Sequence, residues 1–370
     1  MGGSAAHESP PALIPKNTRG GFARRLFAGP PELRARLIGI CGVLAVLNAG
    51  AWLCALAVFR GTPVSLALML MIYGLGLRHA VDADHIAAID NVTRKFMEDR
   101  RRPVAVGFFF ALGHSAVVLI VTMVVARTAR MLGSFQSFRD LGGSISVCVS
   151  TLFLLAIAIM NIVVFRSVYK TYRRVRAGGA HVEQDLSAVL NSGGLLSRLF
   201  RPLFGLVTRS WHMLPLGFLF GLGFDTATEV AVFSISIAQA AQGVSLWGVL
   251  VFPALFAAGM SLVDTTDGVM MLGAYEWAFV NPLRKLYYNM TITLLSVAIA
   301  LLVGAIEALG LLGHRFRLDG PVWRLIATLN GNFTDLGLFI IGLILLAWAL
   351  SYLLYQFGKL GQVSVPRTES

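Results

Sequence analysis

The residues best suited to metal chemistry lie in one short stretch at the end of a long apolar run. Within eight positions the chain places an arginine, two histidines and two aspartates, namely Arg78, His79, Asp82, Asp84 and His85. Each charge near a bilayer centre costs roughly 2.5–3.5 kcal/mol on insertion scales, so ionisable groups at membrane depth are expected to be functional. Imidazole and carboxylate together are ligands of divalent transition metals. The stretch therefore predicts a metal site inside a membrane.

The spacing leaves open which carboxylate accompanies the two imidazoles. At 100° per residue, His79, Asp82 and His85 share one face of a regular helix, whereas Asp84 points away from it. Asp84 joins the histidines only if the helix is interrupted here, and the Gly-Leu-Gly sequence just upstream favours such an interruption. The alternative without a metal is an internal ion-pair cluster around Arg78.

The composition is that of a polytopic membrane protein. Of the 370 residues, 56% are hydrophobic and only 14% are charged, whereas soluble domains carry about 25% charged residues. The three cysteines show neither pair spacing nor a CxxC motif, which argues against a disulfide framework and a thiolate metal site. The net charge of +12 comes from basic loops between apolar spans, which is typical of membrane topology and not of nucleic-acid binding.

Eight apolar stretches reach bilayer length, so we expect an all-α protein with eight transmembrane helices. They cover residues 37–59, 64–90, 104–126, 142–165, 213–240, 245–275, 289–312 and 333–357. Of the 31 Lys and Arg residues, 23 fall in the terminal segments and loops on one side and 7 in the loops on the other. The positive-inside rule places the first side, with both termini, in the cytoplasm.

The chain divides into two membrane halves joined by a linker. We expect a disordered, Pro-rich cytoplasmic arm at residues 1–33 and a cytoplasmic tail at 358–370. The first half covers residues 34–165 and the second covers 213–357. Between them, residues 166–212 carry Gly pairs and mixed polar residues and are expected to form a cytoplasmic linker loop.

Two short matches relate the halves to each other. Residues 74–76 match residues 221–223, and residues 110–115 match residues 256–261, at offsets of 147 and 146. Helices 2 and 3 therefore pair with helices 5 and 6. Because helix 2 runs inward and helix 5 outward, the matches predict an inverted repeat, with the site at the repeat interface as in many secondary transporters.

Further polar residues interrupt the third, fifth and sixth spans. His114 follows a glycine that permits close helix approach, so it either lies beside the first cluster or bonds to a neighbouring helix. In span five, Asp225 and Glu229 share a helix face, as do Asp264 and Asp267 in span six. Two close carboxylates disfavour joint ionisation unless a cation lies between them, and that cation is a metal, a proton or the arginine. Carboxylates near span ends are expected to face water: Glu276, Glu307 and Asp335.

Four stretches resemble the signatures of the nickel/cobalt transporter (NiCoT) family. Residues 78–86 are similar to the second-helix signature, with its specific His-x4-Asp-His core, and residues 112–115, 216–229 and 255–268 are similar to the other three. The resemblance covers all eight spans in order and is closest to the high-affinity nickel permeases. It implies that the two histidines and the aspartate of the core are needed for transport, and it favours Asp84 over Asp82 as the carboxylate ligand.

Together, the residues and the resemblance predict a permease of the bacterial inner membrane that imports Ni²⁺, with Co²⁺ as a second candidate substrate. The expected metal ligands are His79, Asp84 and His85. Residues expected around the ligands or along the ion path are Arg78, Asp82, His114, Asp225, Thr226, Glu229, Asp264 and Asp267.

We expect the metal ion and the lipid bilayer as partners, and no prosthetic group, nucleic acid or nucleotide-binding subunit. The chain contains no HExxH, GxSxG or Walker A sequence, so it is not expected to be an enzyme. The alternatives are a membrane-embedded metal hydrolase, a permease for another divalent metal, and a metal sensor, which should carry a cytoplasmic output domain.

Overall fold

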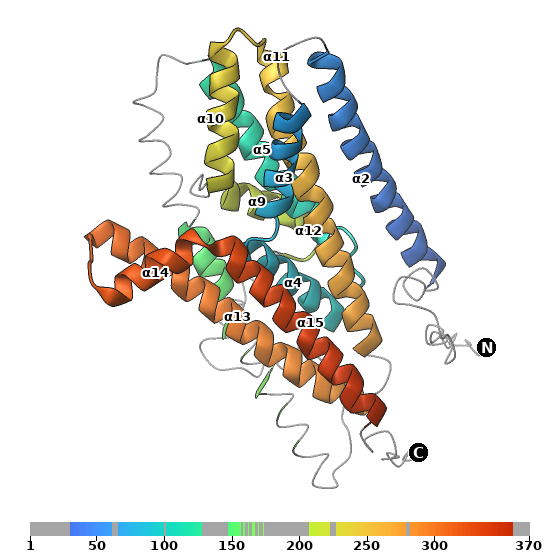
Figure 1. Ribbon diagram of the computed structural model, residues 1–370. Helices are drawn as coiled ribbons and strands as arrows, with labels where there is room; N and C mark the ends of the chain where they lie inside the picture. The colour runs from blue at the N-terminus through green and yellow to red at the C-terminus, as the bar shows by residue number, and fades with distance from the viewer. Residues whose placement is uncertain are drawn as a thin grey trace, which may run out of the picture.

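The computed structural model describes residues 30–60, 66–99, 101–127, 147–156, 207–222, 227–278 and 282–357, together with scattered residues from 158 to 173. Every regular element in these ranges is a helix (Figure 1). The predictions for nearly all of the N-terminal arm, most of the linker and the C-terminal tail fall outside the described residues. The division into two halves therefore stays a prediction.

Several helices are long and apolar enough to cross a membrane, which confirms the all-helical membrane class. Within the described residues there are four single spans, formed by α2 (Pro31–Val58), α5 (Val106–Arg127), α12 (Val251–Ala278) with the short α11 (Leu246–Val249), and α13 (Pro282–Phe316). Two bent pairs raise the number of candidate spans to six: α3 (Leu66–His79) with α4 (Ala83–Glu98), bent by 53°, and α14 (Pro321–Gly331) with α15 (Phe333–Phe357), bent by 76°.

The two other predicted spans correspond to shorter helices. The fifth contains α9 (Met213–Gly221) and α10 (Ala227–Ala241), which point in different directions in Figure 1. The fourth contains a short apolar helix at residues 147–156. The count of eight transmembrane helices and the inverted repeat therefore stay predictions.

α2 shows why these helices need a lipid environment. Only 11% of its apolar window is buried inside the protein, and side chains such as Val46 and Leu53 are largely exposed. A helix that is apolar all round is stable when other protein or lipid surrounds it. Because protein covers so little of α2, lipid must cover the rest.

The interruption expected in the second span lies at residues 80–82, between α3 and α4. The backbone N–H of Asp82 donates to the carbonyl oxygen of His79 at 2.9 Å, and Asp82 becomes the N-cap residue of α4. The Gly-Leu-Gly sequence is not the place of the break. Gly76 instead permits close packing, because a Cβ there would overlap the carbonyl oxygen of Phe256 on α12.

α12 holds the helices of the site together. It packs against α2, α3, α4 and α5. In Figure 1, α3, α5, α10 and the first half of α12 form an upper group, and α4, α13, α15 and the end of α12 form a lower one. The α3–α4 break lies where the two groups meet, and glycines bring the helices into backbone contact around it.

Two charged residues lie deeper in the fold than the sequence suggested. Arg94 belongs to a stretch that was expected to be a cytoplasmic loop, but α4 continues to Glu98 and the Arg94 side chain is only 1% exposed. Glu307, which was expected to face water, is buried on α13 and accepts a hydrogen bond from Ser150 Oγ at 2.8 Å. Both expectations fail because apolar runs mark span ends only to within one or two helical turns.

Candidate metal centre

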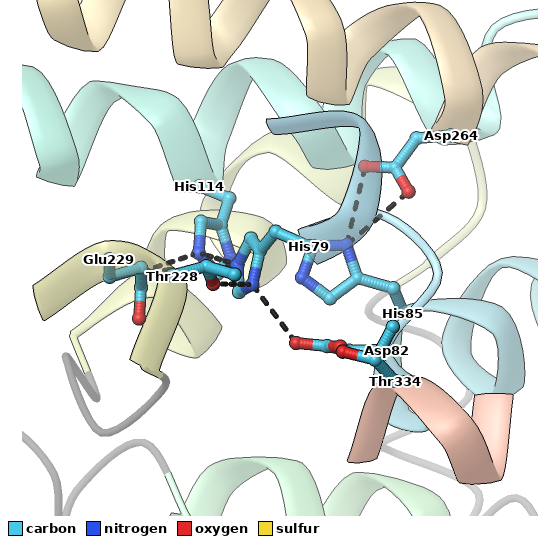
Figure 2. Close-up of polar contacts among 8 residues, drawn as sticks. All are labelled: His79, Asp82, His85, His114, Thr228, Glu229, Asp264 and Thr334. Carbon is cyan, nitrogen blue, oxygen red and sulfur yellow. Dashed lines mark hydrogen bonds and ion pairs between the residues drawn. The ribbon is translucent and has the colours of Figure 1, made fainter. Parts of the chain in front are cut away.

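Three imidazoles from three helices meet at the α3–α4 break. His79 ends α3, His85 lies at the start of α4, and His114 lies midway along α5. One nitrogen from each ring lies within 4.8 Å of the other two, and the three residues are 1%, 0% and 3% exposed. In an unbroken helix His79 and His85 would be about 9 Å apart along the axis, but the turn brings their ring centres to 4.7 Å. Figure 2 shows the three rings turned toward one another.

A carboxylate lies behind each of the first two rings and fixes its orientation. Oδ2 of Asp82 lies 3.0 Å from Nδ1 of His79. Both oxygens of Asp264 lie 3.3 Å from Nδ1 of His85. An ionised carboxylate only accepts hydrogen bonds, so each Nδ1 carries the proton and donates it. The lone pair of Nε2 is then directed away from the carboxylate, as in the carboxylate–histidine pairs that support metal ligands.

The two Nε2 atoms differ in what they face. Nε2 of His85 is buried and has no hydrogen-bond partner among the described residues. Nε2 of His79 lies 3.0 Å from Nε2 of His114, and the latter lies 2.9 Å from Oε1 of Glu229. A proton on Nε2 of His114 satisfies both contacts. A metal ion among these atoms would take the place of that proton.

The spacing of these atoms is compatible with one shared metal ion. Two ligands bound at about 2.1 Å lie about 3.0 Å apart at right angles, about 3.4 Å apart in a tetrahedron and about 4.2 Å apart when opposed. Nε2 of His79 lies 3.0 Å from Nε2 of His114 and 3.9 Å from Oε1 of Glu229, which is within this range. Nitrogen and oxygen donors suit Ni(II), Cu(II) and Zn(II).

Asp84 does not belong to this group of nitrogens. It lies half-buried in the first turn of α4 and is not among the residues whose ligand atoms lie within 4.8 Å of one another. The break that was expected to turn Asp84 toward the histidines instead places Asp82 against His79. The assignment of Asp84 as a ligand stays a prediction, while the described contacts place His114 and Glu229 beside the histidines.

The other predicted residues fall into different places. Arg78 has an exposed side chain, and Asp82, Glu229 and Asp264 form their described ion pairs with histidines, which disfavours the ion-pair cluster around Arg78. Asp267 is half-buried one turn beyond Asp264, and its Oδ2 has no hydrogen-bond partner in the part of the chain that the structure covers. Two predicted residues lie outside the described residues: Asp225 and Thr226.

Sequence reasoning missed two threonines that contact the site. Oγ1 of Thr228 lies 3.2 Å from Nδ1 of His79, and the neighbouring acidic residue Glu229 was the only signal for it. Oγ1 of Thr334, on α15, donates to Oδ1 of Asp82. No local pattern marks Thr334, because it lies 252 residues further along the chain than its partner.

Removing the charge behind His85 should weaken metal binding. We expect Asp264→Asn to lower Ni²⁺ affinity about 10- to 100-fold, because an amide is free to donate to Nδ1 and so favour the wrong tautomer. Isothermal titration of the purified protein measures this, with Asp319→Asn on an exposed loop as the control. Unchanged affinity in Asp264→Asn would show that Asp264 does not orient the His85 ring.

Buried imidazoles at a break between membrane helices, each in contact with a carboxylate, are typical of ion sites in membrane carriers. The chain belongs to the NicO family of high-affinity nickel-transport proteins, whose model matches residues 65–354.

Relatives of known name agree with this membership. The chain is 54% identical over 327 residues to the high-affinity nickel transport protein of Cupriavidus necator, covering 88% of this chain and 93% of that protein. It is 44% identical to the high-affinity nickel-transport protein NixA of Helicobacter pylori, over 78% of this chain and 89% of that protein. It is also 39% identical to the cobalt transport protein NhlF of Rhodococcus rhodochrous, over 85% of this chain and 91% of that protein. No solved structure matches.

Proposed function

We propose that this chain is a secondary permease of the bacterial inner membrane that imports Ni²⁺, with Co²⁺ as a second substrate. The observation that carries the proposal is the buried cluster of His79, His85 and His114 in a member of the nickel-transport family. The nickel substrate follows the relatives named for nickel, and the cobalt substrate follows the relative named for cobalt.

The ion binds to nitrogens of the three histidines and to Oε1 of Glu229. This set replaces Asp84 with a carboxylate from α10 and keeps both histidines of the His-x4-Asp-His core. The widest separation among the three nitrogens, 4.8 Å at most, exceeds the about 4.2 Å of opposed ligands, so the rings close by less than about 1 Å on the ion. Zn²⁺ and Cu²⁺ also bind such donors, so the fixed geometry of the rings must supply the selectivity.

The ion leaves the site along α12 toward the cytoplasm. Asp264 supports His85, and Asp267 lies one helical turn nearer the end of that helix, with a carboxylate oxygen that has no hydrogen-bond partner among the described residues. Carboxylates along a path hold a divalent ion weakly enough to release it, because they offer charge without a complete coordination sphere.

The proposed topology has eight spans, an inverted repeat and both termini in the cytoplasm. The position of the termini is supported by the distribution of basic residues. It is also supported by the start of α2 and the end of α15, which both lie toward the lower end of Figure 1.

Cysteine labelling tests this orientation. In a background without the native cysteines, a membrane-impermeant maleimide should label Asp319→Cys in intact cells, and Arg102→Cys only after permeabilisation. Both positions are exposed, so the result reports the side of the membrane. Labelling of Arg102→Cys in intact cells would reverse the proposed direction of the chain.

Uptake of ⁶³Ni²⁺ by cells that lack their own nickel importer tests the function. Cells that express the chain should accumulate nickel with saturable kinetics, and excess Co²⁺ should inhibit uptake more strongly than excess Mn²⁺, which prefers oxygen ligands. Uptake no higher than in vector controls, with the protein present in the membrane, would remove nickel import from the proposal.

A further inference from the structure

The first turn of α15 lies directly on the α3–α4 break. Thr334 Oγ1 donates a hydrogen bond of 2.5 Å to Oδ1 of Asp82. One turn further along α15, a Cβ at Gly337 would overlap the carbonyl oxygen of Val81. A hydrogen bond and a backbone contact therefore attach α15 to the residues that separate α3 from α4.

Asp82 connects this contact to the metal centre. Its Oδ1 accepts from Thr334, and its Oδ2 accepts from Nδ1 of His79 at 3.0 Å. Asp82 is buried, so a partner lost from either oxygen is not readily replaced by bulk water. A carboxylate held at both oxygens has one orientation, and that orientation sets the plane of the His79 ring. Figure 2 shows the contact between Asp82 and His79, with Thr334 beside Asp82.

The hydroxyl of Thr334 is directed across the helix interface. Threonine in a helix commonly bonds the carbonyl oxygen four residues earlier in its own helix, as Thr266 does with Leu262 and Thr328 does with Arg324. Thr334 lies in the first turn of α15, where the helix has no carbonyl oxygen four residues earlier, and its hydroxyl donates to a residue of another helix.

A second acceptor near His79 makes this support necessary. Oγ1 of Thr228 lies 3.2 Å from Nδ1 of His79, against 3.0 Å for Oδ2 of Asp82. If Asp82 lost one of its two bonds and turned, Nδ1 of His79 would donate to Thr228. Nε2 of His79 would then move away from its position 3.0 Å from His114.

We propose that Thr334 is a positioning residue for metal binding: its hydroxyl holds Asp82 so that Asp82 orients His79. The inference rests on the proposed function, because it assigns Thr334 a role in the same metal site. It makes α15, which contributes no ligand to that site, a determinant of its affinity.

The test compares Ni²⁺ affinity in purified full-length variants by isothermal titration. Thr334→Val keeps the shape and removes the hydroxyl, and it should weaken binding about 10-fold or more. Thr334→Ser keeps the hydroxyl and should restore affinity to within about threefold of wild type. The matched control is Thr328→Val on α14, which should bind as wild type because its hydroxyl bonds only its own helix.

A double-mutant cycle separates positioning from a general structural role. In an Asp82→Ala background, Thr334→Val should cause no further loss of affinity, because the hydroxyl acts through Asp82. An equal loss in both backgrounds, or wild-type affinity in Thr334→Val, would overturn the inference and leave nickel transport standing. If Thr334→Val does not give folded protein, Thr334→Ala removes the same hydroxyl and takes its place. A wild-type protein that binds no Ni²⁺ would instead contradict the proposed function.

Discussion

Each of the single variants His79→Ala, His85→Ala and His114→Ala should lose Ni²⁺ uptake completely, while the variant proteins still reach the membrane. The three nitrogens converge on one buried point, so the loss of any one removes a ligand and leaves a gap that bulk water does not readily reach. Loss of a group that only supports a ligand costs about 10- to 100-fold in affinity, and loss of a ligand should cost more. Uptake of ⁶³Ni²⁺ at several concentrations measures the effect, with His314→Ala at an exposed position as the control.

Asp84→Ala belongs in the same experiment, because it distinguishes two ligand sets. If Asp84 is a ligand, its variant should lose uptake as completely as the histidine variants. If Glu229 supplies the oxygen ligand instead, Asp84→Ala should keep measurable uptake with weakened affinity, and Glu229→Gln should lose uptake. Normal uptake by His114→Ala would remove His114 from the site and restore the ligand set that the family resemblance implies.

Gly76→Ala should strongly destabilise the protein, whereas Gly74→Ala should not. A Cβ at Gly76 would overlap the carbonyl oxygen of Phe256, which forces α3 away from α12. Beyond the neighbouring residues and backbone of its own helix, no atom of the described residues lies within 4 Å of a Cβ at Gly74, one half-turn earlier. Overpacking costs about 1–3 kcal/mol and more where backbone must move, whereas alanine replaces glycine in a helix with a gain of up to about 1 kcal/mol.

Thermal unfolding of the purified variants in detergent measures this difference. Gly76→Ala should unfold at a clearly lower temperature than wild type and should also lose Ni²⁺ uptake, because His79 lies one turn further along the same helix. Gly74→Ala should unfold at or slightly above the wild-type temperature. Equal behaviour of the two variants would show that α3 and α12 do not pack with their backbones in contact.

The four to six candidate spans within the described residues were predictable from sequence because lipid requires long apolar runs. A break in the second span was expected from the upstream glycines, and Asp84 could join the histidines only if the helix was interrupted. The place of the break was not predictable from the glycines. Asp82 ends the turn as the N-cap residue of α4, and Gly76 serves helix packing.

The partners of the site were predictable only where they share a helix or a recognisable signature. His79, Asp82 and His85 lie in one stretch, and the contact between Asp82 and His79 follows from their spacing of three residues. A position of His114 beside the first cluster was one of two alternatives from the sequence, and choosing between them required the fold. Thr334 is followed by Asp335, but that carboxylate was expected to face water, so the sequence did not direct attention to Thr334.

If Ni²⁺ binds to the three histidines around the α3–α4 break, X-ray absorption at the nickel edge should detect all three. The measurement is made on purified wild-type and His114→Ala protein, each loaded with less than one equivalent of Ni²⁺. We expect outer-shell scattering from three imidazoles in the wild type and from two in His114→Ala, with oxygen in the remaining positions. A spectrum of oxygen ligands alone, or an imidazole count that is the same in both proteins, would contradict it.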